Sequence, residues 1–198
     1  MNLLSVASEV FPLVKTGGLA DVVGALPPAL AKHGVHATTF VPGYPGLAAR
    51  LKKKKEVHAY TDLFGAKASI LHGEAAGLDL LVLHAPKLFD RKGGPYGDAS
   101  GADFPDNWRR FAAFSRAGAD IAGGAVKGYA PDIVHAHDWQ AAMTLAYLRY
   151  DGLAMPTVMT VHNLAFQGRF PLSTFPISGC RRRRCPSTAS NITAAWAI

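Results

Sequence analysis

The first forty residues combine an apolar run, a glycine turn and a helical repeat in an order that few folds can accommodate. Residues 2–7 are almost continuously apolar, residues 19–33 repeat apolar positions at helical spacing, and residues 35–41 are rich in β-branched side chains. A strand, a helix and a second strand in so short a length predict a parallel β-α-β unit. Pro27 and Pro28 are expected to kink or interrupt the helix, because proline lacks the backbone N–H that would bond one turn back.

The same alternation continues along the chain. Residues 56–72 predict a hairpin around Phe64-Gly65, and Lys52–Lys55 are expected on an exposed helix end or loop. Further buried strands are predicted at residues 78–83, 132–136 and 156–161. Near-continuous apolar strands that alternate with helices predict an α/β fold with a Rossmann-like, doubly wound, mostly parallel sheet. In such a fold the ligand crevice lies outside the carboxyl ends of the strands.

Two helices in the second half have aspartates at their expected starts. Asp106 is expected to cap a helix with an apolar stripe, and Asp138 to cap the helix 139–150. Residues 91–105 are punctuated by glycine and proline and predict a long loop. A loop of this length inside a compact domain is usually functional or mobile.

The loop between the first strand and the first helix carries Lys15, Gly17 and Gly18. A glycine pair lets a ligand approach the backbone, and the start of the following helix favours an anion. The pattern predicts a phosphate-bearing ligand, although a plain Gly-Gly turn beside a solvated lysine is the alternative. It is neither a Walker loop nor the dinucleotide pattern G-x-G-x-x-G, which disfavours a Rossmann dehydrogenase.

The string SEVFPLVKTGGLADVVGALP at residues 8–27 closely resembles the amino-terminal signature of the bacterial glycogen synthases and plant starch synthases, and TVHNLAFQG at residues 160–168 is also similar to that family. The resemblance covers residues 1–176. It implies the N-terminal Rossmann-like half of a GT-B glycosyltransferase. This half is incomplete as an enzyme, because in such enzymes a second domain, which the resemblance does not cover, supplies further contacts to the donor. It implies no cofactor and no metal.

The resemblance also implies roles for individual residues. As catalytic residues it gives His162, which reaches the glucose of the donor, Lys15 and Asp21, with Gly17 and Gly18 beside the phosphate or sugar. For substrate binding it adds Asn163, Glu9, Tyr96, Asp138 and Trp139. From the residues alone, His162 could equally be a structural histidine, Tyr96 a packing anchor, and Asp21 a carboxylate that favours the first helical turn.

His135 and His137 invite a metal interpretation, since alternate residues of a strand project from one face. We expect both to be structural, because Asp138 would point elsewhere as a helix cap and the resembling family uses no metal there. Cys180 and Cys185 have no nearby histidine or cysteine to complete a zinc set.

The formal charge of +7 raises the question of a nucleic-acid partner. Arg181–Arg184 supply four of the basic residues, and residues 1–177 hold 17 basic against 14 acidic side chains, so most of the chain is only mildly basic. No aromatic residues interleave the lysine run for base stacking. We expect no specific nucleic-acid partner, no membrane span and a cytoplasmic location.

The activity implied by the resemblance is retaining transfer of glucose from ADP-glucose to the non-reducing end of an α-1,4-glucan such as glycogen. A non-catalytic glucan-binding fragment is the main alternative, and a nucleic-acid binder acting through the tail is another. Residues 177–198 form a basic, Ser/Thr/Ala-rich tail outside the expected domain 1–176. We hypothesise that this tail is disordered or comes from out-of-frame coding sequence, and translation of the source DNA in the other frames tests the latter.

Overall fold

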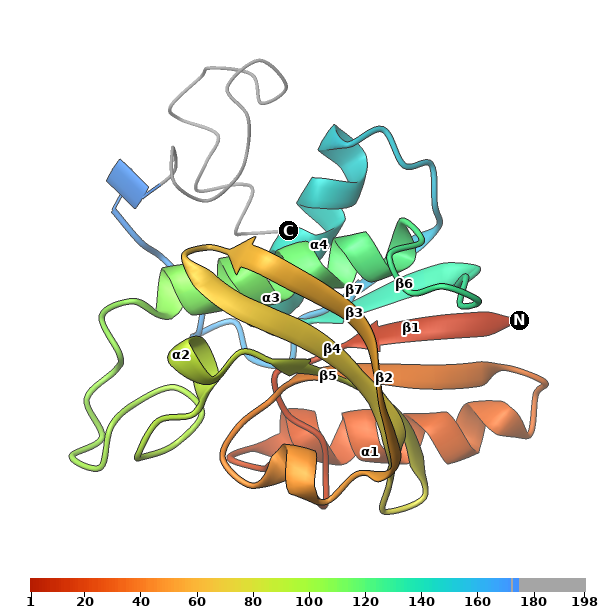
Figure 1. Ribbon diagram of the computed structural model, residues 1–198, viewed down its shortest axis with the longest axis horizontal. Coiled ribbons are helices and arrows are strands. Elements are labelled where there is room, and N and C mark those ends of the chain that lie inside the picture. The colour runs from red at the N-terminus through yellow and green to blue at the C-terminus, as the bar shows by residue number, and fades with distance from the viewer. Residues whose placement is uncertain (172, 175–198) are drawn as a thin grey trace.

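The computed structural model describes residues 1–171, 173 and 174, which form one mixed β-sheet with helices on both faces (Figure 1). The elements are β1 (Asn2–Val6), α1 (Gly18–Ala31), β2 (His36–Pro42), the 3₁₀ turn η1 (Leu47–Ala49), β3 (Lys52–Leu63), β4 (Ala66–Ala75), β5 (Leu78–His84), α2 (Pro86–Phe89), α3 (Asn107–Ala122), β6 (Ile133–His137), α4 (Asp138–Tyr150) and β7 (Thr157–Thr160). The strand order is β3-β4-β5-β2-β1-β6-β7. The five strands from β5 to β7 in this order pair in parallel, and the hairpin β3–β4 adds two antiparallel strands at one edge. The predicted mostly parallel α/β sheet is confirmed.

Helix α1 covers one face of the sheet, while α3 and α4 cover the other (Figure 1). Strand β5 shows why the central strands are continuously apolar. Leu81 and Leu83 belong to the core cluster on the α3 side, and Leu80 and Val82 to the cluster on the α1 side. Because both faces of the strand are buried, no position is left for an alternating polar residue.

The neighbours β1 and β6 mark the point where the chain changes direction across the sheet. From β1 the chain passes into α1 on one face, and from β6 it passes directly into α4 on the other. The loops at the carboxyl ends of these two strands therefore diverge and leave a crevice between them, as expected for a doubly wound sheet.

Helix α1 differs from expectation, because it continues through Pro27 and Pro28 to Ala31. Its buried residues, Leu19, Ala20 and Val23, all lie before the prolines. The second half is partly or fully exposed to solvent. The prolines therefore fall where the helix is no longer buried in the core, although they still remove the N–H donors that would bond to the carbonyls of Val23 and Gly24.

The expected loop or helix end at Lys52–Lys55 is also wrong, since these residues begin strand β3. Lys52 and Lys55 pair with Glu74 and His72 of β4, and all four lysines are exposed. Lysine is common on edge strands, whose outer side has no strand beside it. The predicted hairpin at Phe64-Gly65 is confirmed.

The two predicted helix caps are wrong as side-chain contacts. Asp106 is at the N-cap of α3, but its carboxylate binds the guanidinium of Arg91 at 2.7 and 2.6 Å and makes no cap hydrogen bond. Asp138 is the first residue of α4, and the N-cap is His137. The tail 177–198, with Cys180 and Cys185, lies outside the described residues. In the described part of the chain, none of the helices combines the length and the hydropathy that crossing a bilayer requires.

Candidate functional site

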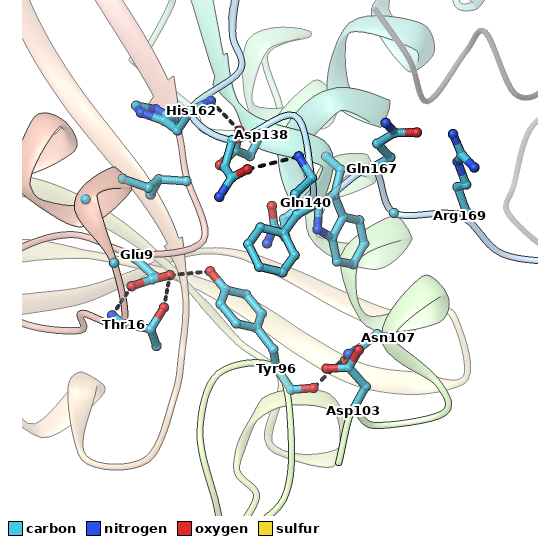
Figure 2. A pocket seen from close by; sticks show the side chains of 18 of the residues that line it. Glu9, Thr16, Tyr96, Asp103, Asn107, Asp138, Gln140, His162, Gln167 and Arg169 are labelled. Atoms are coloured by element: carbon cyan, nitrogen blue, oxygen red, sulfur yellow. Dashed lines mark hydrogen bonds between the residues drawn. The ribbon is translucent and has the colours of Figure 1, made fainter. Parts of the chain in front are cut away.

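A cleft of about 960 Å³ opens at the carboxyl ends of β1, β6 and β7 (Figure 2). Four segments contribute its lining: residues 9–22 after β1, residues 96–107 before and at the start of α3, residues 138–140 at the start of α4, and residues 162–170 after β7. The expectation that the loops after these strands meet at one edge of the sheet is therefore confirmed. Of the ten predicted site residues, the lining includes eight: Glu9, Gly17, Gly18, Tyr96, Asp138, Trp139, His162 and Asn163.

Glu9 connects the glycine loop to the long loop before α3. Its carboxylate is almost completely buried, with 2% of the residue exposed, and accepts hydrogen bonds from the backbone N–H and the hydroxyl of Thr16, the latter at 2.7 Å. The hydroxyl of Tyr96 donates to the same carboxylate at 2.5 Å (Figure 2). Hydrogen bonds to an ionised acceptor are among the strongest in proteins. Glu9 therefore holds the backbone just before Gly17 in a fixed position.

Tyr96 is held by neighbours on two sides. Ser8 Oγ lies 2.8 Å from the Tyr96 hydroxyl oxygen, which is left to accept because its proton goes to Glu9. Burial and the nearby Tyr44 and Glu9 raise the pKa of Tyr96, so the hydroxyl stays protonated and remains a donor. The backbone carbonyl of Tyr96 accepts from Asn107 Nδ2 at 2.7 Å. Because its hydroxyl donates to Glu9, Tyr96 connects two segments of the lining as well as contributing to it.

Arg110 of α3 was not among the predicted site residues. It is completely buried and donates to the carbonyls of Leu88 at 2.7 Å and Pro95 at 3.0 Å, and to Asn107 Oδ1 at 2.6 Å. These bonds tie the loop that carries Tyr96 to the helix beneath it. An arginine four residues before Phe114, on the apolar stripe of a predicted helix, is the sequence signal that could have identified it.

Within the described residues, neither packing nor backbone conformation requires the glycine pair. A Cβ atom added at Gly17 or at Gly18 would meet no atom within 4 Å, and neither residue has a left-handed backbone. Both residues line the cleft, and α1 begins here without a side-chain cap. The first N–H groups of a helix and its positive dipole end favour a negative charge.

Lys15 and Asp21 are the two predicted site residues outside the lining. Lys15 Nζ lies 2.6 Å from both carboxylate oxygens of Asp21 and 5.5 Å from the ring centre of Phe11. About half of each charged side chain is exposed. The structure thus places the pair beside the glycine loop at the first turn of α1, where an acidic residue is favoured.

Asp138 joins the loop after β7 to the start of α4. Its Oδ1 accepts the backbone N–H of His162 at 2.7 Å (Figure 2). This contact, made across 24 positions of the chain, replaces the expected helix cap. Asp138 also has a positive φ of 56°, a conformation that side-chain-bearing residues adopt rarely and that is frequent at functional sites.

The aromatic and amide residues of the cleft are packed by their neighbours. The Trp139 ring lies 5.1 Å from the Phe111 ring and 5.5 Å from the Phe170 ring, centre to centre. Gly168 lies against its indole, because an added Cβ would come within 2.5 Å of the ring. Asn163 Oδ1 accepts the N–H of Ala165 at 2.9 Å and so shapes the turn after His162.

His135 and His137 project from the same face of β6, as the alternation predicts, with ring centres 4.0 Å apart. His135 Nε2 lies 2.7 Å from Thr160 Oγ1 of β7. His137 is completely buried between His135 and His162. Among the described residues no group of three or more metal-ligating side chains is close enough to hold an ion.

Comparison with known proteins assigns the chain to a family. The starch synthase catalytic domain family matches residues 2–193. The glycogen synthase of Mesorhizobium japonicum is 65% identical over 176 residues, which cover 88% of this chain and 37% of that protein. Glycogen synthase 1 of Rhizobium meliloti is 60% identical over 178 residues, or 89% of this chain and 37% of that protein. The chain therefore spans just over a third of the length of these curated relatives.

Among solved structures, the catalytic domain of starch synthase IV from Arabidopsis thaliana, bound to ADP and acarbose, is similar, with a TM-score of 0.73 and 30% identity over 90% of this chain and 37% of that one. Sequence and fold lead to the same group of enzymes, and the chain belongs to the starch synthase catalytic domain family, the glycosyltransferase family of the bacterial glycogen synthases.

Proposed function

We propose that this chain forms one side of the active site of a glycogen synthase, which transfers glucose from ADP-glucose to the non-reducing end of an α-1,4-glucan with retention of configuration. The observation that carries the proposal is the meeting of the uncapped start of α1 at Gly17-Gly18 with His162 in one cleft. The helix start and the open glycines suit a phosphate of the donor. An imidazole can bind a sugar hydroxyl through either ring nitrogen.

Lys15 supplies mobile positive charge at this end of the cleft. Its partner Asp21 is half exposed, and an exposed ion pair is worth only about 0–1 kcal/mol. The ammonium can therefore exchange Asp21 for a phosphate oxygen at small cost. Such an exchange gives Lys15 a role in donor binding although its side chain lies outside the cleft lining.

The carboxylates of the cleft support a front-face, ion-pair-like transfer. Retention through a covalent intermediate needs a free carboxylate as nucleophile. Glu9 is occupied by three hydrogen bonds, and Asp138 accepts the N–H of His162. Asp103, the third carboxylate of the lining, lies beyond Tyr96, away from His162 (Figure 2). None of the three is a well-placed nucleophile, so we favour collapse of an ion pair on the face that the leaving group vacates.

The charge of the cleft supports the further proposal that this chain has no transferase activity alone. The lining includes three carboxylates, those of Glu9, Asp103 and Asp138, against the single guanidinium of Arg169. A nucleotide diphosphate needs more positive charge than this in the transition state, when the leaving group gains negative charge. The missing cations would have to come from outside the described cleft.

The same lining favours a second candidate function, the binding of a glucan without catalysis. Neutral sugar rings pack on aromatic side chains, and Tyr96, Phe104, Trp139, Phe166 and Phe170 all line the cleft. With this function the chain would bind glycogen but not ADP-glucose. Co-sedimentation with glycogen, in the absence of ADP-glucose, measures that function directly.

Incorporation of [¹⁴C]glucose from ADP-glucose into glycogen tests the main proposal. The assay compares this chain with a hybrid in which residues 1–176 are joined to the rest of the Mesorhizobium japonicum glycogen synthase. We expect no incorporation by the chain and clear incorporation by the hybrid. A folded hybrid without activity would overturn the glucosyltransferase assignment, and activity of the chain alone would overturn the need for the second half.

A further inference from the structure

The imidazole rings of His135, His137 and His162 lie one after another beside the cleft, and of these three only His162 lines it. The ring of His137 has its centre 4.0 Å from that of His135 and 5.3 Å from that of His162. His137 Nδ1 lies 3.0 Å from His162 Nε2, and His137 Nε2 lies 3.3 Å from the hydroxyl oxygen of Ser5. Ser5, His137 and His162 thus form a hydrogen-bonded chain from the core of the sheet to the cleft.

The imidazole of His137, which lies between Ser5 and His162, is neutral. His137 is completely buried, and burial together with the neighbouring His135 and His162 lowers its pKa to about 3. A neutral imidazole has one N–H and one unprotonated nitrogen. The proton on His137 therefore decides which ring donates in the contact between His137 Nδ1 and His162 Nε2.

Two arrangements of the protons, both with neutral rings, satisfy the hydrogen bonds among Ser5, His137 and His162. In the first, His137 carries its proton on Nδ1 and donates to His162, while the Ser5 hydroxyl donates to His137 Nε2. In the second, His162 carries its proton on Nε2 and donates to His137 Nδ1, while His137 Nε2–H donates to Ser5. The two differ at His162 Nδ1, which is a donor in the first arrangement and an acceptor in the second.

One distance and one chemical consequence favour the second arrangement. Hydroxyl donors lie within about 3.0 Å of an acceptor and N–H donors within about 3.2 Å, so the separation of 3.3 Å at Ser5 is nearer to the range of an N–H donor. The second arrangement also lets His162 accept a proton on Nδ1 with no rearrangement of the buried ring. In the first, the proton on His137 Nδ1 would have to move first, because His162 Nε2–H could not face it.

We propose that His137 is a positioning residue for His162: with Ser5 it holds the proton of the neutral His162 ring on Nε2 and leaves Nδ1 as the hydrogen-bond acceptor for a hydroxyl of the sugar. The sugar as the ligand rests on the proposed function, whereas the tautomer rests on the described contacts alone. The unprotonated Nδ1 of His162 thereby accepts a hydrogen bond from a hydroxyl of a neutral sugar.

Long-range ¹H–¹⁵N spectra of the chain labelled with [¹⁵N]histidine test the tautomers without any need for activity. We expect neutral His162 and His137 both to carry their proton on Nε2. Ser5→Ala removes the acceptor of His137 Nε2–H at little cost in volume, so protonated Nδ1 should become detectable in both rings. Ser115→Ala, a buried serine whose hydroxyl donates to the Gln140 carbonyl instead, is the matched control and should change neither ring.

Two replacements of His137 separate positioning from packing. His137→Asn retains an amide oxygen near the place of Nδ1 and should keep the His162 proton on Nε2, whereas His137→Phe removes the acceptor and should give a mixture. A His162 proton on Nδ1 in the wild-type chain, or the same tautomer in wild type, Ser5→Ala and His137→Phe, would overturn the proposal. If His137→Phe does not fold, the wild-type and Ser5→Ala spectra still decide.

The hybrid described above relates the tautomer to transfer. We expect His137→Phe to lower kcat/KM by about 10- to 100-fold and His137→Asn to recover most of the loss, with both variants folded by circular dichroism. Equal losses in the two variants would contradict positioning through the hydrogen bond. An inactive hybrid with the expected tautomers would count against the proposed function and leave the positioning of His162 supported.

Discussion

The hydroxyl of Tyr96 donates a 2.5 Å hydrogen bond to the carboxylate of Glu9, a residue 87 positions earlier in the chain. Through Glu9 the contact reaches Thr16 and the glycine loop, and through the Tyr96 carbonyl it reaches Asn107 of α3. Two walls of the cleft are thereby fixed relative to each other before any ligand arrives. Such fixed positions lower the cost of binding, because less of the site has to be ordered.

Replacement of Tyr96 by phenylalanine should lower the free energy of unfolding by about 1–3 kcal/mol, because one bond to a buried carboxylate is lost. Urea denaturation of the chain measures the change. Tyr60→Phe removes a similar bond, made to Asp120 at 3.2 Å away from the cleft. We expect both variants to lose stability, but only Tyr96→Phe to weaken ADP-glucose use by the hybrid. Equal donor KM in the two variants would contradict the role of Tyr96.

Gly18→Ala should separate ligand binding from stability. Alanine favours the helix by up to about 1 kcal/mol over glycine, and the added Cβ meets no protein atom. Unfolding should therefore be unchanged or slightly harder, while the donor KM of the hybrid rises as the Cβ blocks close approach. Gly94→Ala, in a loop position with similar space, serves as control. An unchanged donor KM in Gly18→Ala would show that no ligand lies against this backbone.

Lys15→Ala should change donor use more than glucan use. Loss of one charge-assisted contact to a phosphate corresponds to about 1.5–3 kcal/mol, or roughly a 10- to 150-fold rise in the KM for ADP-glucose. The exposed pair with Asp21 adds less than about 1 kcal/mol to folding, so stability should barely move. Steady-state kinetics of the hybrid with each substrate varied in turn, beside Lys32→Ala at the other end of α1, make the comparison. Parallel changes in both KM values would speak against a donor contact.

Acid should destabilise the chain through His137. Its folded pKa of about 3 is lower than the value of 6.5 in the unfolded chain, so below pH 6.5 the unfolded state binds the proton first. Stability is then lost as the pH falls, by up to about 1.4 kcal/mol per pH unit between pH 6.5 and 3. Urea denaturation measures the free energy of unfolding at pH 7 and at pH 5. Its decrease between the two should be about 2 kcal/mol smaller in His137→Asn than in the wild type. Identical pH profiles would mean that His137 titrates normally in the folded chain.

Arg110→Met should release the loop that carries Tyr96. The substitution keeps most of the volume but leaves the Leu88 and Pro95 carbonyls and Asn107 Oδ1 without their donor, at about 1–3 kcal/mol for each group that is buried. Limited trypsin digestion at Arg91 and Lys92 should accelerate. Arg109→Met, which loses a contact with the Phe64 carbonyl on the hairpin side, should not have this effect. Equal digestion rates would show that Arg110 does not hold the loop.

The parts of the fold that could be predicted are those that local patterns determine. Strands such as β5 are buried on both faces, so their sequence is continuously apolar and easy to recognise. Because parallel strands end at one edge, the predicted order also brought His162 and the glycine loop to one cleft. The lysines of β3 could not be recognised in this way, since an exposed edge strand has no apolar pattern and lysine disfavours strands only weakly.

The details of the cleft depend on contacts between distant residues. Asp138 has the right residue type for a helix cap, yet its carboxylate meets the N–H of His162 from another strand. Arg110 has the right position for the core but the wrong polarity for it, and its hydrogen bonds to Asn107 and to the carbonyls of Leu88 and Pro95 explain its burial. No local sequence pattern contains such pairings, so only the three-dimensional arrangement could show them.

The exposed lysines of β3 also affect how the chain behaves at high concentration. A row of like charges on the outer strand repels the same strand of a second molecule, which opposes the edge-to-edge joining of sheets that leads to fibres. This repulsion acts over about 8 Å at physiological ionic strength and about 3 Å in 1 M salt. The colloidal stability of the chain is thus connected to the salt content of its solution through one strand far from the cleft.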